Sequence, residues 1–137
     1  MPTTPPITSD LISATVESDA RLVKRHLDAG ADANEATAAG HTALHVAVLG
    51  GSTEIVKILI EHGAEVDGRD KYGKTPLHCA ARHGHADIAR LLVEHGAAVN
   101  AMAKNGSFPL DWAIKFEHNA LAEFLRARGA ETGKALR

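Results

Sequence analysis

Apolar residues in the third quarter of the chain recur at the spacing of a helix. Leu77 and Ala80 fall on one side of a short helix that would follow Thr75 and end at Gly84. Thr75 can act as the N-cap, and Pro76 would take the first helical position, where its missing N–H costs no hydrogen bond. The pattern therefore predicts one short helix between Thr75 and Gly84.

A second segment with helical spacing follows directly. Ile88, Leu91 and Leu92 fit one face of a helix, and Gly96 stands where a left-handed C-terminal cap is expected. From residue 97 to residue 106 the helical spacing is lost and small residues predominate, which indicates an extended turn or a short hairpin. This part of the sequence predicts a unit of helix, turn, helix and loop.

The same unit recurs along the chain with a period of 33 residues. Gly30, Gly63, Gly96 and Gly129 stand at this interval, and each of them is followed by alanine. Leucine and alanine recur in phase as well, at Leu11, Leu44, Leu77 and Leu110 and at Ala14, Ala47, Ala80 and Ala113. A pair of such short helices cannot bury its apolar side alone, so the copies must stack on one another. The chain is therefore predicted to contain about four stacked copies.

The recurring residues resemble an ankyrin repeat over its full length. The resemblance rests on the run from Thr75 to Ala80, which reads TPLHCA, on the run from Gly96 to Asn100, and on the run from Gly40 to Ala47 in the preceding copy. It extends over residues 7–132 and implies an all-α ankyrin-repeat solenoid of stacked helix-turn-helix-loop units. The positions that carry the repeat motif are Thr42, Leu44, His45, Thr75, Pro76, Leu77, His78, Gly30, Gly63, Gly96 and Gly129.

The resemblance makes residues 1–137 a single domain. The expected parts are an N-terminal capping repeat at 7–36, a second repeat at 37–69, a third at 70–102, a C-terminal capping repeat at 103–132 and a tail at 133–137. The terminal copies depart from the motif, as expected for repeats that shield the ends of an open stack. The first has no TPLH equivalent, and the last has Phe108 where the third has Thr75.

Composition narrows the class of protein further. The 137 residues include 15 lysines and arginines against 17 aspartates and glutamates, a net charge of −2, which argues against binding nucleic acid or anionic membranes through bulk positive charge. A single cysteine, Cys79, excludes an internal disulfide and a cysteine-based zinc or iron–sulfur site. No apolar run is long enough to cross a membrane and no secretory signal is visible, so we expect a cytoplasmic protein, with secretion by a signal-independent route left open. We also expect a monomer.

Residues that could carry chemistry do not form a recognisable active site. Cys79 adjoins His78, but neighbouring helix residues point in different directions, and a packing or surface role for the thiol is favoured. Histidines at corresponding positions of stacked repeats, such as His85 and His118, would lie about 8–10 Å apart, too far to share one zinc ion. The resemblance implies that His45 and His78 form hydrogen bonds to neighbouring loops. We therefore expect no enzyme activity, no cofactor and no metal site.

The resemblance implies recognition of a partner protein through a concave surface, which consists of the loop tips and the first helix of each repeat. At the tips it selects Arg69, Lys71, Tyr72, Met102, Lys104 and Asn105. On the first helices and the segments leading into them it selects His41, Lys74, Ser107, Leu49, Arg82, His83, Trp112, Lys115 and Phe116. Six of these fifteen residues are lysine or arginine and none is acidic, so a basic surface with aromatic anchors is predicted, which suits an acidic protein segment.

Three alternatives stay open. Trp112 and Phe116 could pack within the C-terminal repeat, with the nearby lysines simply solvated. The scaffold could bind nucleic acid or another ligand, or carry an enzyme activity that its motifs do not reveal. Finally, Asn100, with Leu92 eight positions upstream, resembles the site that asparaginyl hydroxylases modify in ankyrin repeats, so the chain could be a substrate; Ala98 departs from the acidic residue usually preferred there.

Overall fold

The computed structural model describes residues 11–133, which form eight helices joined by turns and loops. The helices are α1 (Leu11–Val16), α2 (Ala20–Asp28), α3 (Ala43–Leu49), α4 (Thr53–Glu61), α5 (Pro76–His83), α6 (Ala86–Glu94), α7 (Pro109–Lys115) and α8 (Asn119–Ala127). Residues 7–10 of the expected N-terminal repeat and 134–137 of the expected tail lie outside the described residues. None of the helices in the described range is long and apolar enough to cross a membrane.

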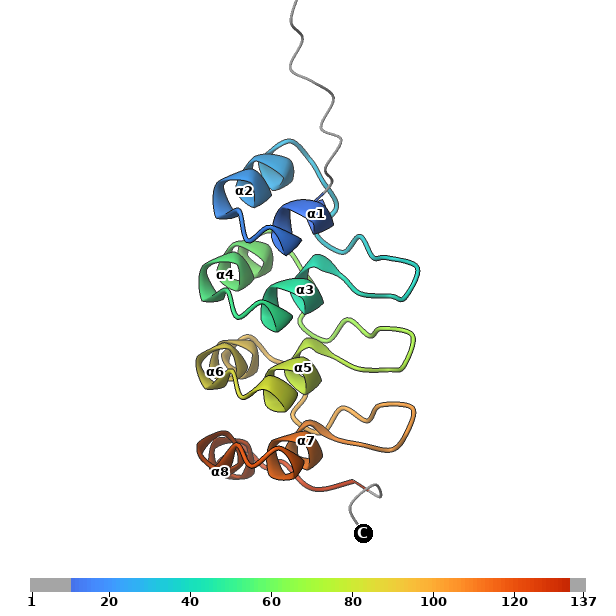
Figure 1. Cartoon of the computed structure of the whole chain (residues 1–137), viewed down its shortest axis with the longest axis vertical. Coiled ribbons are helices and arrows are strands. Elements are labelled where there is room, and N and C mark those ends of the chain that lie inside the picture. Colours follow the sequence, from blue (N-terminus) through green and yellow to red (C-terminus); the bar gives the residue numbers. More distant parts are fainter. Residues whose placement is uncertain (1–10, 134–137) are drawn as a thin grey trace, which may run out of the picture.

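The helices form two parallel columns. Figure 1 shows α1, α3, α5 and α7 in one column, α2, α4, α6 and α8 in the other, and the long loops projecting beyond the first column. Each helix packs on its own partner and on the corresponding helices of the adjacent pairs, so that α5 contacts α3, α6 and α7. Within residues 11–133 the only β pairing is one bridge, between Ala36 and Thr42. The predicted all-α stack is confirmed.

Local sequence sets where the helices begin and end. The Thr75 hydroxyl accepts a hydrogen bond from the His78 N–H at 3.4 Å and Pro76 occupies the first turn, as the sequence predicts. The helix ends at Gly84, whose φ of 72° lies in the left-handed region that favours glycine. Gly96, with a φ of 92°, follows the end of α6 in the same way. Each unit is thus a helix, a tight turn, a second helix and a loop.

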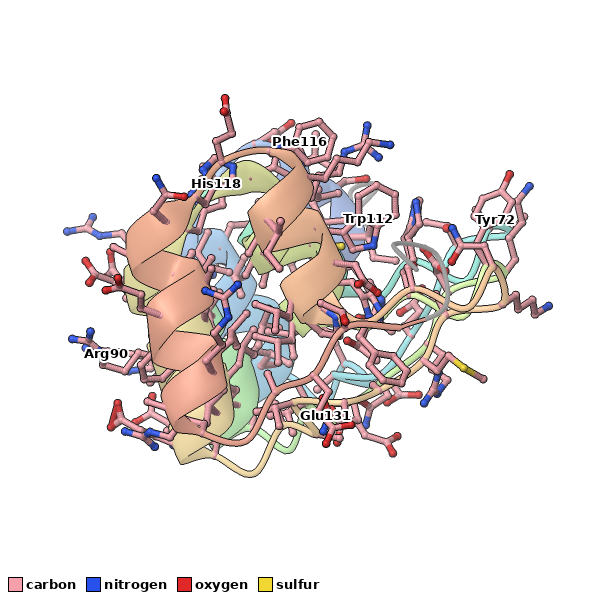
Figure 2. The ribbon with its side chains drawn as sticks, turned by 90° about the horizontal axis from the view of Figure 1, so that it is seen from below. Tyr72, Arg90, Trp112, Phe116, His118 and Glu131 are labelled. Carbon is pink, nitrogen blue, oxygen red and sulfur yellow. The ribbon has the colours of Figure 1, made fainter. Side chains whose placement is uncertain are left out.

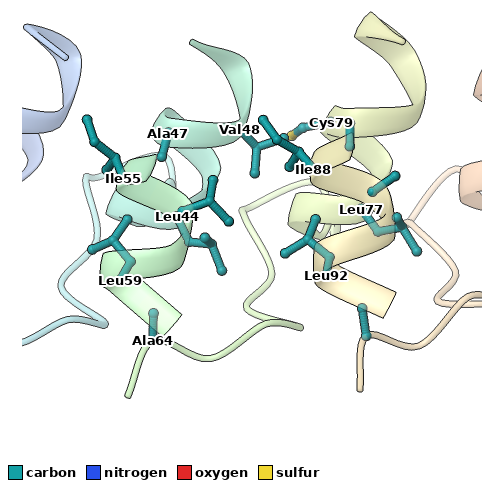
Figure 3. Packing of buried hydrophobic residues seen from close by; sticks show 14 of the residues in the cluster. Leu44, Ala47, Val48, Ile55, Leu59, Ala64, Leu77, Cys79, Ile88 and Leu92 are labelled. Atoms are coloured by element: carbon teal, nitrogen blue, oxygen red, sulfur yellow. The ribbon is translucent and has the colours of Figure 1, made fainter. Parts of the chain in front are cut away.

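The core follows the phase of the repeat. Leu44, Leu77 and Leu92 are completely buried, and Figure 3 shows such side chains gathered on the helices of two successive pairs. Burying one leucine side chain contributes roughly 2 kcal/mol. Ala47 on α3 and Ala80 on α5 are also buried, and these two helices of adjacent pairs contact each other. Stacking therefore supplies the burial that one pair lacks.

The loops are joined to one another by backbone hydrogen bonds. The Lys71 N–H donates to the Ala39 carbonyl at 2.9 Å, and the Lys104 N–H donates to the Tyr72 carbonyl at 2.9 Å. Gly73 permits the second contact, because its φ is 77° and a Cβ there would lie 3.0 Å from the Lys104 nitrogen. The loop tips consequently form a continuous edge that can position side chains.

Candidate partner-binding surface

Asp70 shapes the loop tip that presents Tyr72 and Lys74. Its buried carboxylate accepts hydrogen bonds at Oδ1 from the Tyr72 and Lys74 backbone N–H groups, both at 2.9 Å. Its Oδ2 lies 3.3 Å from Nε2 of His41 on the preceding segment. Side-chain acceptance of hydrogen bonds two and four residues ahead is the usual way in which aspartate fixes a tight turn. These contacts define the backbone conformation from which the Tyr72 and Lys74 side chains project.

His78 connects the third helix pair to the next loop. Nδ1 accepts a hydrogen bond from the Thr75 N–H at 3.1 Å, which leaves the ring hydrogen on Nε2, and Nε2 donates to the Ser107 carbonyl at 3.0 Å. His45 makes the same two contacts one repeat earlier, at 3.2 Å and 2.9 Å. Burial lowers the pKa of both imidazoles, because a charged ring would lose its hydration. The expected hydrogen bonds to neighbouring loops are confirmed.

Three cations surround the indole ring of Trp112. Lys74 Nζ, Arg82 Cζ and Lys115 Nζ lie 5.6 Å, 5.6 Å and 5.3 Å from the ring centroid, within the range of a cation–π contact. Phe116 lies nearly parallel to the indole, at a centroid distance of 6.0 Å, and both rings lie on the α7 side in Figure 2. Between residues 11 and 133 no lysine or arginine is within ion-pair distance of a carboxylate. The three cations around Trp112 therefore have no ion-pair partner within residues 11–133.

A groove of about 220 Å³ lies between the loop tips and helices α3, α5 and α7, and we call it the central groove. Figure 2 shows Tyr72 on the loop side and Trp112 on the helix side. The residues that line it are His41, Leu49, Asp70, Tyr72, Lys74, His78, Cys79, Arg82, His83 and Trp112. Seven of these belong to the predicted concave surface, so the structure brings residues from two loops and three inner helices to one place.

Most of the predicted contact residues are accessible, with one correction. His41, Lys74 and Trp112 are half-buried. The exposed residues are Leu49, Arg69, Lys71, Tyr72, Arg82, His83, Met102, Lys104, Asn105, Lys115 and Phe116. Ser107 is buried, at 2% exposure, because its N–H and hydroxyl both donate to Asn105 Oδ1 and its carbonyl accepts from His78. The expectation that Ser107 contacts a partner is therefore wrong, and its role is structural.

Sequence reasoning missed three residues that line the central groove. Asp70 carried a usable signal, since an aspartate followed three positions later by glycine favours a turn. His78 and Cys79 face the groove although both are buried, and no pattern in the sequence distinguishes that direction from the core. Burial raises the pKa of the Cys79 thiol to about 11, so the thiol stays protonated at neutral pH and is a poor nucleophile. This agrees with a packing role for Cys79.

The comparison with known families decides the class of this stack. The family model described as ankyrin repeats (3 copies) matches residues 11–103 and 69–135. The chain belongs to the ankyrin repeat family. Ankyrin repeats are in general protein–protein interaction modules and are typically not enzymes. Comparison with curated proteins gave no match.

Three further histidines of the ankyrin stack form hydrogen bonds to backbone carbonyls. His62 and His95 use Nδ1 to bond the carbonyls of Ile58 and Leu91 at the ends of their helices, both at 2.9 Å. His118 Nε2 lies 2.9 Å from the Arg82 carbonyl of the preceding pair. Over the described ankyrin repeats, no three histidine, cysteine or acidic side chains are grouped so that they could hold a metal ion.

Asn100 connects two neighbouring ankyrin units. Its side-chain amide donates to the Gly129 carbonyl at 3.1 Å and its Oδ1 accepts from the Glu131 N–H at 2.8 Å. Asn34 makes the corresponding pair of bonds two units earlier, at 3.2 Å and 2.7 Å. These contacts assign a structural role to Asn100, and its hydroxylation stays a prediction that mass spectrometry of the protein, after incubation with such a hydroxylase, would test.

Proposed function

We propose that the chain is a non-enzymatic protein-interaction module that binds an acidic segment of a partner protein through its concave surface. This surface consists of the loop tips and of helices α3, α5 and α7, with the central groove between them. We expect the module to act as a monomer in the cytoplasm. Membership of the ankyrin repeat family supports the general role, and the residues on this surface support the acidic partner.

The observation that carries the proposal is the combination of accessible aromatic rings with unpaired cations. Tyr72 is 54% exposed and Phe116 is 40% exposed, although both are large apolar side chains. Lys74 lies over the rings of both Tyr72 and Trp112. Aromatic residues and arginine dominate binding energy at protein interfaces, and unpaired cations favour a partner of opposite charge. An acidic segment with apolar residues would therefore satisfy both features.

The proposal predicts that binding of the partner protein depends on the concave surface and not on helices α2, α4, α6 and α8. Tyr72→Ala combined with Arg82→Ala should weaken the partner complex by about 2 kcal/mol or more, roughly thirtyfold in Kd. Partners would be captured from the native host, identified by mass spectrometry and titrated as purified proteins. The matched control is Arg90→Ala, since Arg90 is an exposed arginine of the same repeat that lies on the opposite side in Figure 2.

Two outcomes would contradict the proposal. A partner held equally by the double variant and by Arg90→Ala would place the interface elsewhere, provided that circular dichroism shows both variants folded. Turnover in a broad substrate screen, or tight binding of DNA or RNA, would favour the enzyme or nucleic-acid alternative. We expect neither, because the near-neutral net charge lacks the excess of cations on which nucleic-acid binding depends.

A further inference from the structure

The Trp112 indole N–H has no hydrogen-bond acceptor. Its Nε1 is excluded from solvent and is one of two buried side-chain polar atoms within residues 11–133 that lack a partner. An indole N–H is a donor only, and a buried one normally finds an acceptor. Leaving such a donor unsatisfied is unfavourable, so a ligand that brings an acceptor gains from meeting it. The ring that carries this donor lines the central groove.

The surroundings of the ring indicate that the missing acceptor is negatively charged. Lys74 and Arg82 both lie 5.6 Å from the indole centroid, and neither has a carboxylate within ion-pair distance. Asp70 is the one carboxylate among the residues that line the groove, and it is already engaged by two backbone N–H groups and by His41. An incoming carboxylate would therefore meet two cations without an ion-pair partner and one N–H without an acceptor.

The size of the groove suits one inserted side chain. Its volume of about 220 Å³ is smaller than the roughly 300–1,000 Å³ of sites for cofactors and drug-sized molecules. Lys74 and Arg82 have long side chains that can change rotamer, so a ligand reaches the indole when these two side chains move apart. An extended segment with one inserted side chain fits this arrangement better than a compact small molecule.

We propose that the central groove binds an aspartate or glutamate side chain of an acidic protein segment. The carboxylate accepts a hydrogen bond from Trp112 Nε1–H and lies between the cations of Lys74 and Arg82. This inference rests on the proposed function, and it adds the chemical group that is recognised and the residues that recognise it. Hydrogen bonds with one charged partner are stronger than neutral ones, which makes this contact a centre of affinity.

The test uses the indole N–H as its own probe. Trp112 is the only tryptophan, so the indole region of a proton–nitrogen NMR spectrum contains one signal that belongs to it. An eight-residue oligoglutamate peptide is titrated into the folded protein, and an oligoglutamine peptide of the same length serves as the matched ligand control. We expect the indole proton signal to move downfield with oligoglutamate and to stay in place with oligoglutamine.

Variants then separate the groove from general electrostatic attraction. Arg82→Gln and Trp112→Phe should each weaken oligoglutamate binding about five- to tenfold, the latter because phenylalanine keeps a ring but has no N–H. Arg90→Gln removes the same charge from the outer side and should change the Kd less than twofold. Circular dichroism checks the fold of each variant, and Arg82→Gln keeps the test valid if Trp112→Phe does not fold, because Arg82 is exposed.

Several outcomes would overturn the inference. These are an indole signal that does not respond to oligoglutamate, equal losses of affinity in Arg82→Gln and Arg90→Gln, or a response to a DNA oligonucleotide or inorganic phosphate but not to the peptide. Failure of this site is distinguishable from failure of the proposed function. The double variant of Tyr72 and Arg82 could lose its partner although oligoglutamate does not bind the wild-type protein. That result would support the interaction module and refute the carboxylate site.

Discussion

In the third helix pair His78 donates a hydrogen bond outward from Nε2, whereas in the last pair Asp111, 33 residues later, accepts hydrogen bonds at the corresponding position. His78 Nε2 lies 3.0 Å from the Ser107 carbonyl of the next loop. The Asp111 carboxylate accepts from the Gly133 N–H, at 3.0 Å and 2.9 Å from its two oxygens. Both side chains also accept from the backbone N–H three residues before them. Both side chains thus accept the same local hydrogen bond, but His78 is a donor to the neighbouring segment and Asp111 is an acceptor from it.

The difference follows from what lies next to each pair. An interior pair faces the loop of another repeat, which presents a carbonyl, so a donor is needed. The last pair faces residues 131–133 of its own chain, which present the Gly133 N–H, so an acceptor is needed. Gly133 is buried at this contact, and a Cβ there would collide with the Gly106 carbonyl oxygen. The last described pair therefore makes a specific contact with the segment that follows it, where an interior pair contacts the loop of the next repeat.

The largest expected difference between the two regions concerns core packing. Leu77 and Leu110 are in phase and buried, but α5 packs on pairs at both sides whereas α7 packs on one. Leu77→Ala should lower the free energy of unfolding by about 3–5 kcal/mol and Leu110→Ala by about 2–3 kcal/mol, because the end of the stack relaxes around a cavity more easily. Urea denaturation followed by circular dichroism measures both. Equal losses would mean that the end is as constrained as the interior.

A smaller effect should distinguish the two polar contacts. His78→Ala leaves the Ser107 carbonyl and the Thr75 N–H without partners and should cost about 2–3 kcal/mol of unfolding free energy. Asp111→Asn keeps the shape but turns one acceptor oxygen into a donor, and should cost about 1–2 kcal/mol.

Hydrogen exchange shows where each polar substitution acts. Asp111→Asn should lower amide protection mainly in α7 and α8, and His78→Ala should lower it on both sides of the junction between α5 and α7. A loss of protection in Asp111→Asn that extends to α3 would refute the view that this contact stabilises the end of the stack alone.

The repeated part of the fold could be predicted from the sequence because each signal occurs several times. Thr75 and Gly84 mark the ends of one helix, and the phased glycines and leucines repeat that information in the other copies. The resemblance to an ankyrin repeat implies the roles of His45 and His78, which stand at the same position in two copies. Position within a repeat therefore identifies both the helix ends and the contacts between loops.

The parts that occur once were predicted less well. Ser107 shares its repeat position with Lys74, and repeat position alone indicated a surface side chain. In the structure the Ser107 hydroxyl donates a hydrogen bond to Oδ1 of Asn105, two residues earlier in the same loop. The corresponding residue of the preceding copy is Tyr72, which cannot make this contact. The unsatisfied N–H of Trp112 also depends on how two loops and three helices meet. Such an arrangement has no periodic signal in the sequence, so only the structure reveals it.

The pH dependence of the free energy of unfolding should show the smallest difference between the interior pairs and the last pair. Burial lowers the pKa of His45 and His78 below the ordinary value of 6.5, and the last pair has no histidine at this position. At pH 7.5 these imidazoles are neutral in the folded and the unfolded chain, so their hydrogen bonds contribute fully. As the pH falls below about 6.5, the unfolded chain binds protons more strongly than the folded chain does, and the free energy of unfolding decreases.

Urea denaturation between pH 7.5 and pH 5.5 measures this loss, above the range in which most carboxylates titrate. Each histidine can contribute at most about 1.4 kcal/mol per pH unit, and His78→Gln should flatten the profile by removing one such contribution. His62→Gln is the opposite control, because hydrogen bonds to the Ile58 carbonyl and to Asp28 raise the pKa of His62, which favours the folded state as the pH falls. Its removal should leave the profile equally steep or slightly steeper. A wild-type stability that stays constant or rises between pH 7.5 and pH 5.5 would show that the interior contacts tolerate a charged imidazole.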